Sequence, residues 1–126
     1  MNEQLVQRLV FTRGAIGMAA WLAPRLSGRL FGLDPEGNPQ AAYLGRLFGV
    51  RDVALGFGLS SSRGPERRQW LQIGVACDVA DAAAGLLAGR AGDLPKRSTV
   101  LVTGTALLAA AMGVAAMRGE EPPASA

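Results

Sequence analysis

The feature that most restricts the fold of this chain is a run without any charged side chain, over residues 98–117. At a rise of about 1.5 Å per residue, a helix over this run would be roughly 30 Å long, which is the thickness of the hydrocarbon layer of a bilayer. Three further segments are mostly apolar and of similar length, and they cover residues 5–23, 40–61 and 69–89. Pro24 is expected to end the first helix, and Pro65 with Glu66 suits the first turn of the third. The sequence therefore predicts an all-α fold, a four-helix transmembrane bundle with short loops.

A chain of 126 residues has room for one domain, because separate domains normally need about 100 residues each. We expect the membrane domain to cover residues 1–117. We expect a disordered tail over residues 118–126, because this proline-containing stretch has no hydrophobic anchor. Between the first two predicted helices, arginines alternate with apolar residues over 25–33, as in a segment that lies in the headgroup layer. The links over 60–68 and 90–97 are short and polar.

The composition excludes several classes of function. The chain has no histidine and one cysteine, Cys77, so neither an internal disulfide nor an ordinary zinc site is expected, and we expect no cofactor. The net charge of +3 comes from arginine. Basic residues such as Arg63, Arg67 and Arg68 flank hydrophobic segments without interleaved aromatic residues, which argues against nucleic acid as a partner. The expected partner of these arginines is the lipid bilayer, through its anionic headgroups.

The bias toward Arg, Ala and Gly is typical of a bacterial genome rich in G and C, and together with the four segments it predicts a multi-pass protein of the bacterial cytoplasmic membrane. Positive charges are nearly balanced between the two sides of the predicted bundle, so the positive-inside rule assigns no orientation. Insertion in both orientations and an antiparallel homo-oligomer stay open. A signal peptide over the first segment and a soluble helical domain are the alternatives to the membrane bundle.

Charged residues also lie well inside the predicted spans, and they are Arg13, Arg46, Arg51, Asp52, Asp78 and Asp81. A central Arg or Asp costs about 2.5–3.5 kcal/mol on insertion, whereas a Leu, Val or Phe returns only about 0.3–0.6 kcal/mol. The second predicted helix, which carries three of these charges, therefore needs partners. We predict a polar network, or a substrate-binding group, that contains Arg13, Arg46, Arg51 and Asp52.

Helical spacing places these charges on stripes of small residues. At about 100° per residue, Asp52 shares one face with Gly45, Gly49 and Gly56. Asp78 and Asp81 share a face of the next helix with Gly74 and Gly85, and Arg13 shares one with Gly17 and Ala20. Small residues let backbones approach closely in lipid, so these glycines are predicted to pack helix against helix. Arg46 and Arg51 point to opposite sides of Asp52, so one is expected to face a neighbouring helix and the other the headgroups or a second subunit.

Three functional hypotheses follow from these charges. The first is an accessory or structural bundle held together by an intramembrane Arg/Asp network. The second is a membrane-embedded enzyme for a lipophilic small molecule, with Asp78 and Asp81 as a catalytic acid and base, because two carboxyls one helical turn apart repel and one of them then stays protonated. The third is a small transporter coupled to protons or ions.

The segment Arg-Leu-Phe-Gly-Val-Arg-Asp-Val-Ala-Leu-Gly over residues 46–56, followed by Trp70-Leu71 and the helix with both later aspartates, resembles small bacterial four-span membrane proteins grouped as a domain of unknown function. The resemblance covers roughly residues 5–117. It implies a four-span membrane fold and no activity.

Overall fold

The computed structural model describes residues 1–118, which contain five helices and no strand. These helices are α1 (Glu3–Leu22), α2 (Pro24–Leu30), α3 (Ala41–Ser61), α4 (Gly64–Arg90) and α5 (Lys96–Met117). The prediction of an all-α fold is confirmed. Of the predicted tail over 118–126, residues 119–126 lie outside the described part of the chain.

The four long helices coincide with the four predicted segments, and the prediction of four helices missed α2. Pro24 ends α1 as expected, but it also occupies the first turn of α2, where its fixed φ and missing N–H are tolerated. Only Ala23, with φ −134° and ψ 64°, separates the two helices. The segment predicted to lie in the headgroup layer is therefore largely helical. The helix α4 begins at Gly64, because Pro65 and Glu66 form its first turn.

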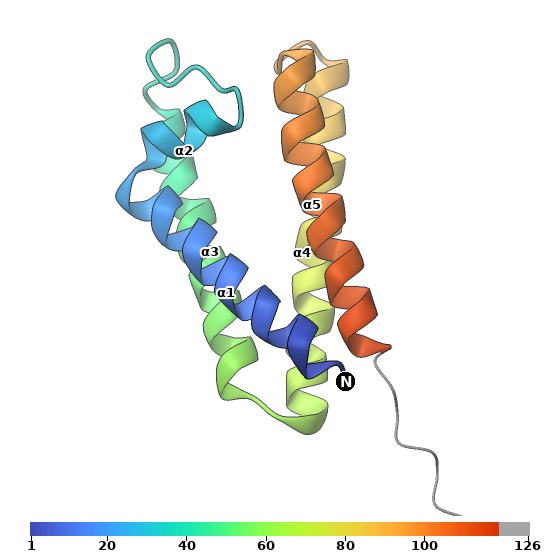
Figure 1. Ribbon diagram of the computed structural model, residues 1–126. Helices are drawn as coiled ribbons and strands as arrows, with labels where there is room; N and C mark the ends of the chain where they lie inside the picture. Colours follow the sequence, from blue (N-terminus) through green and yellow to red (C-terminus); the bar gives the residue numbers. More distant parts are fainter. Residues whose placement is uncertain (119–126) are drawn as a thin grey trace, which may run out of the picture.

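The helices form two arms, which are drawn side by side in Figure 1. The first arm consists of α1, α2 and α3, with α1 packed along α3, and the second arm is the antiparallel pair of α4 and α5. Contacts within each arm are far more extensive than contacts between them. The arms approach each other at the end where the chain begins, where the Asn2 amide donates to the Ala116 carbonyl at 3.0 Å. Toward α2 the ribbons of the two arms stand farther apart, and there the Ser98 side chain of α5 reaches the Gly32 carbonyl oxygen after α2.

Glycines allow α1 and α3 to cross with their backbones in contact. A Cβ built on Gly17 would lie 2.6 Å from the Gly49 carbonyl oxygen, and a Cβ built on Gly49 would lie 2.6 Å from the Gly17 carbonyl oxygen. No side chain fits at either position, which is the reason why this pair of helices requires glycine there. In the second arm, Gly85 similarly faces Thr103 of α5, with 2.6 Å between its built Cβ and the Thr103 hydroxyl oxygen.

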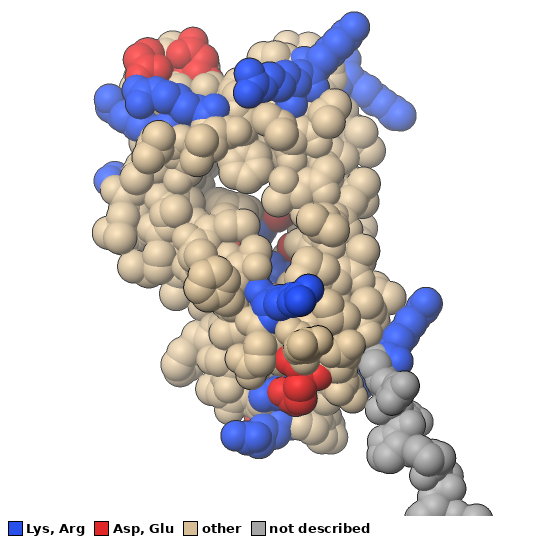
Figure 2. Space-filling view, viewed as in Figure 1, with Lys and Arg blue, Asp and Glu red and all other residues tan. Residues whose placement is uncertain are grey.

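Large apolar side chains lie mainly on the outside of the molecule. Phe11 is 77% exposed, Phe57 is 72% exposed and Val100 is 70% exposed, and they stand among many exposed leucines and valines. The apolar core is small and lies where the arms meet, and it is made of Val6, Leu9, Leu59, Leu71 and Ala116. Figure 2 shows a surface of mostly uncharged side chains between two ends where most of the visible Lys and Arg side chains gather.

Two helices, α4 and α5, are long and apolar enough to cross a membrane, and about a quarter of each is buried inside the protein. The other two long helices, α1 and α3, are not among these candidate spans, and both carry charged side chains in their central turns. Arg13 lies in the middle of α1, and Arg46, Arg51 and Asp52 lie in α3. By length and composition alone, the structure therefore contains two candidate spans within the described residues.

Substitution of Gly17 tests the α1–α3 contact. We expect Gly17→Ala to destabilise the protein by about 1–3 kcal/mol, because the new methyl group would overlap the α3 backbone. The matched control is Gly14→Ala on the same helix, where a Cβ would meet nothing within 4 Å. Alanine there should be neutral or stabilising by up to about 1 kcal/mol through its higher helix propensity. Denaturant unfolding of both variants in detergent micelles, followed by circular dichroism, measures the difference. Equal stability of the two variants would contradict the close crossing.

Candidate functional site

The candidate site is a network of charged side chains that crosses from one arm to the other. Arg13 comes from α1, Arg51 and Asp52 come from α3, and Asp78 and Asp81 come from α4. Each residue lies at or near the middle of its helix. The presence of buried Arg/Asp salt bridges, which the sequence predicted, is confirmed.

Arg13 is the most enclosed cation of the network. Its two terminal nitrogens donate to the two carboxylate oxygens of Asp78, at 3.2 Å (Nη1 to Oδ1) and 2.6 Å (Nη2 to Oδ2). Arg13 is 6% exposed and Asp78 is 4% exposed, so the pair is removed from solvent. Gly74, one turn before Asp78, leaves the space for the guanidinium, because a Cβ there would lie 2.8 Å from Nη2 of Arg13. This bidentate pair therefore connects the first arm to the second.

Arg51 forms a second bidentate pair with Asp81, nearer the surface. Its terminal nitrogens donate to Oδ1 and Oδ2 of Asp81 at 3.0 Å and 2.5 Å. The two side chains are 35% and 30% exposed. The guanidinium also lies over the ring of Phe48, with 5.0 Å between Cζ and the ring centroid, which is a favourable cation–π arrangement. Both ion pairs thus join α4 to the first arm.

Asp52 lies between the two arginines without a hydrogen bond to either. Its Oδ1 is 3.6 Å from Nη1 of Arg13 and 3.8 Å from Nη2 of Arg51. These distances are too long for hydrogen bonds. The oxygen is buried, and within residues 1–118 it has no hydrogen-bond partner. Asp52 is therefore close to positive charge but is not held by it.

The structure places Arg46 outside the network in which the sequence analysis included it. Its side chain is exposed, and its Nε donates to the Trp21 carbonyl oxygen at 3.1 Å. Arg46 precedes Arg51 by five positions, which rotates it by about 140° around the helix axis and away from α4. Of the two arginines that flank Asp52 on the helical wheel, Arg51 faces the neighbouring helix. The network therefore contains two guanidinium groups and three carboxylates.

The predicted glycine stripes face residues of three helices, α1, α2 and α5. Gly49 and Gly56 face α1, and Gly45 lies 3.4 Å (from its built Cβ) from the Pro24 side chain at the start of α2. Gly74 faces Arg13, and Gly85 faces α5. These glycines of α3 therefore pack within the first arm. These glycines of α4 leave room for Arg13 of the network and pack against α5 in the second arm. Sequence spacing identifies a face but not the helix that covers it.

No pattern in the sequence predicted two polar contacts that lie at the ends of the arms. Arg67 is buried, and it donates to the Ser62 carbonyl oxygen at 2.9 Å and to Oε1 of Glu3 at 2.5 Å. The expectation that Arg67 contacts lipid headgroups is thus corrected, because Glu3 of α1 already neutralises it. At the other end, the buried Ser98 hydroxyl donates to the Gly32 carbonyl oxygen at 2.7 Å. Only chain folding brings these distant partners together.

A surface ion pair joins α2 to the following link. Arg29 donates to the Glu36 carboxylate, and both side chains are more than half exposed. The hydrogen bond from Arg29 lowers the pKa of the Glu36 carboxyl below its ordinary value. Because both groups are solvated and Arg29 has no role in the buried network, this pair orders the link rather than the site.

The pairing of the aspartates bears on the predicted acid and base. Asp78 and Asp81 each accept both hydrogen bonds of an arginine fork. Both carboxylates are therefore occupied by arginine, and neither has its oxygens free for a substrate in this structure. The residue with an unpartnered buried carboxylate oxygen is Asp52, which the sequence analysis assigned only to the polar network.

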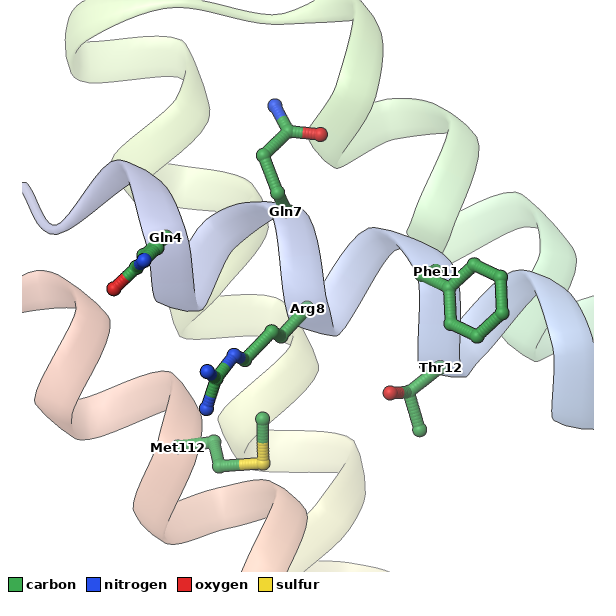
Figure 3. A pocket seen from close by; sticks show the side chains of 6 residues that line it. All are labelled: Gln4, Gln7, Arg8, Phe11, Thr12 and Met112. Atoms are coloured by element: carbon green, nitrogen blue, oxygen red, sulfur yellow. The ribbon is translucent and has the colours of Figure 1, made fainter.

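Two hollows of the described surface lie away from the network. One is an open groove of about 400 Å³ between α1 and α5, shown in Figure 3. It is lined by Gln4, Gln7, Arg8, Phe11, Thr12 and Met112. The other, of about 320 Å³, lies where α4 and α5 join, near Arg90 and Lys96. Neither hollow includes Asp78 or Asp81. Within residues 1–118 there is also no group of three or more His, Cys, Asp or Glu side chains arranged to hold a metal ion.

No family model matches this chain, and no curated protein and no solved structure matches it.

Replacement of Arg13 tests how far the network holds the arms together. We expect Arg13→Met to destabilise the protein by about 3–5 kcal/mol, because it leaves the buried Asp78 without its counter-ion. The matched control is Arg46→Met on α3, which removes an exposed arginine with one backbone contact and should change stability by less than about 1 kcal/mol. Denaturant unfolding in micelles measures both. The network would have no structural role if the two variants unfolded alike.

Proposed function

We propose that this chain is a four-span integral protein of the bacterial cytoplasmic membrane, an accessory or structural bundle whose two arms are joined inside the bilayer by the Arg/Asp network. In this arrangement α1, α3, α4 and α5 cross the membrane, and α2 lies at one of its surfaces. The resemblance of residues 5–117 to small bacterial four-span membrane proteins is part of this proposal.

The observation that carries the proposal is that charged side chains lie inside the protein and large apolar side chains lie on its surface. Arg13, Asp52 and Asp78 are more than nine-tenths buried, whereas large apolar side chains cover the outside of all four long helices. A soluble monomer rarely exposes contiguous apolar surface of more than a few hundred Å², because each Å² left in water costs about 25 cal/mol. In a bilayer the same surface contacts lipid, and the charged residues must face inward.

The dimensions of the helices support four spans. At about 1.5 Å per residue, the 20 residues of α1 and the 21 residues of α3 extend over roughly 30 Å each, close to the thickness of the hydrocarbon layer. Their central charges make each helix costly to insert alone. Pairing removes much of this cost, since Arg13 and Arg51 both meet carboxylates of α4. The helix that is apolar enough to insert thus carries the counter-ions of the helices that are not.

The pairing of the arginines with the aspartates favours a structural role over acid–base catalysis. The two arginines of the network and two of its three aspartates are engaged with each other, and none of these residues lines either of the two hollows described above. A catalytic acid and base would instead need carboxyls that are free to exchange protons with a substrate. The one observation that favours a coupled proton is Asp52, whose Oδ1 has no hydrogen-bond partner in the described chain.

Site-directed labelling distinguishes four spans from two. In a Cys77→Ala background, single cysteines are introduced at Asn38, Arg63 and Asp93, which lie in or next to the three links between the long helices. If four helices span the membrane, a membrane-impermeant maleimide should label positions 38 and 93 from the same side and position 63 from the opposite side. If only α4 and α5 span, position 38 should instead follow position 63.

The same labelling experiment resolves the other outcomes. Insertion in both orientations would label each position from both sides. The fraction of position 38 that is labelled from a given side would still equal the fraction of position 93 labelled from that side. A protein that leaves the membrane fraction on alkaline carbonate extraction would contradict the membrane proposal as a whole. Correct labelling combined with resistance to carbonate would support it.

A further inference from the structure

The charges of the network do not balance. Arg13 and Arg51 supply two positive charges, and guanidinium groups do not lose their protons in proteins. Asp52, Asp78 and Asp81 would supply three negative charges if all of them were ionised. An uncompensated charge in a water-excluded interior is strongly disfavoured, and a buried carboxyl in this situation neutralises instead. The network is therefore one positive charge short.

The hydrogen bonds identify the carboxyl that is left over. Asp78 and Asp81 each receive a complete arginine fork. Asp52 is 5% exposed, and its Oδ1 is buried without a hydrogen-bond partner among the described residues. An ionised carboxylate in such a place would normally accept hydrogen bonds from both nearby arginines, which instead turn to α4. The missing positive charge therefore belongs at Asp52.

A proton fits the surroundings of Asp52 better than a metal ion does. The charged groups around it are Arg13 from α1, Arg51 on its own helix, and Asp78 and Asp81 from α4, and Cys77 of α4 lies near Arg51. The nearest are guanidinium nitrogens, at 3.6 Å and 3.8 Å from Oδ1, and they would repel a metal ion. The two neighbouring carboxylates are already occupied by arginine, so they are not free to complete a coordination shell of several oxygens. A proton needs no such shell.

We propose that Asp52 is a proton-binding site at the centre of the bundle, and that its occupancy controls how firmly the two arms are joined. The proposal rests on the membrane bundle proposed above. With the proton bound, Asp52 is neutral, and both guanidinium groups pair with the carboxylates of α4, Arg13 with Asp78 and Arg51 with Asp81. When the proton passes to water, the Asp52 carboxylate competes with Asp78 for Arg13 and with Asp81 for Arg51, and the connection between the arms weakens.

The structure offers a path by which the proton exchanges. Figure 2 shows an opening between the two arms, with basic and acidic side chains visible at its floor. The Arg51–Asp81 pair is about one-third exposed, and Nη2 of Arg51 also lies 3.8 Å from Oδ1 of Asp52. Asp81 is thus the partly exposed carboxyl of the network, and Asp52 is the enclosed one. Water at the opening would exchange protons with Asp52 past the Arg51–Asp81 pair.

Infrared spectroscopy of the purified protein in micelles tests the proposal, because a protonated carboxyl has a carbonyl stretch at higher frequency than an ionised one. We expect the wild-type protein to show this band at neutral pH and to lose it as the pH rises. The band should be absent in Asp52→Asn and present in the matched control Asp93→Asn, which changes an exposed aspartate outside the network. Absence of the band in the wild type at neutral pH, or its persistence in Asp52→Asn, would overturn the proposal.

A second variant keeps the test decisive if Asp52→Asn does not fold. In Asp81→Asn the charges balance with Asp52 ionised, because Asp52 can take over the fork of Arg51. The band should therefore disappear although Asp52 itself is unchanged, and a band that persists in this variant would contradict the charge count. Loss of the wild-type band on addition of sodium at constant pH would identify a metal-ion site instead. The spectrum needs only the folded protein, so a failure of the labelling pattern would refute the four spans without deciding the protonation of Asp52.

Discussion

The arrangement of the whole molecule depends on the guanidinium of Arg13, which reaches from α1 past α3 to the Asp78 carboxylate of α4. A buried guanidinium is tolerable only when a carboxylate holds it in good geometry, so this contact fixes the distance and register between the arms. The contact is possible because glycines remove two obstacles. Gly17 and Gly49 bring α1 against α3, and Gly74 leaves room for the guanidinium beside α4. Charge pairing and close backbone packing are therefore parts of the same interface.

Within the described residues, polar contacts join the arms at three levels, and the cluster of buried apolar side chains lies at one of them. Arg67 with Glu3 connects the end where the chain begins, the Arg/Asp network connects the middle, and Ser98 with Gly32 connects the end near α2. The small apolar core lies at the first of these levels. In water such an interface would be a poor source of stability, since burial of apolar surface dominates folding there. In lipid, where apolar contacts between helices and with acyl chains are similar, close packing and polar contacts supply the specificity.

An uneven number of charges gives this interface a property that a balanced network lacks. With equal numbers of arginines and aspartates, the pairing would be complete and the bundle static. With Arg46 on the outside, three carboxylates share two guanidinium groups, and the pairing depends on the proton of Asp52. The structural role and the proposed proton site are therefore consequences of the same arrangement, because the groups that hold the arms together are those for which Asp52 would compete.

The sequence by itself determined the helices and the faces on which they carry charge. The uncharged run over 98–117, Pro24 and Pro65 at helix ends and the spacing of glycines and aspartates are local properties, and they predicted four of the five helices and the buried Arg/Asp pairs. Only the tertiary structure decided which partner each charge takes, because rotation around the helix axis sends Arg51 toward α4 and Arg46 to the surface. It also decided that Glu3 meets Arg67 and that Asp52 is left without a hydrogen bond. These outcomes depend on contacts between helices distant in the chain, which residue spacing within one helix does not encode.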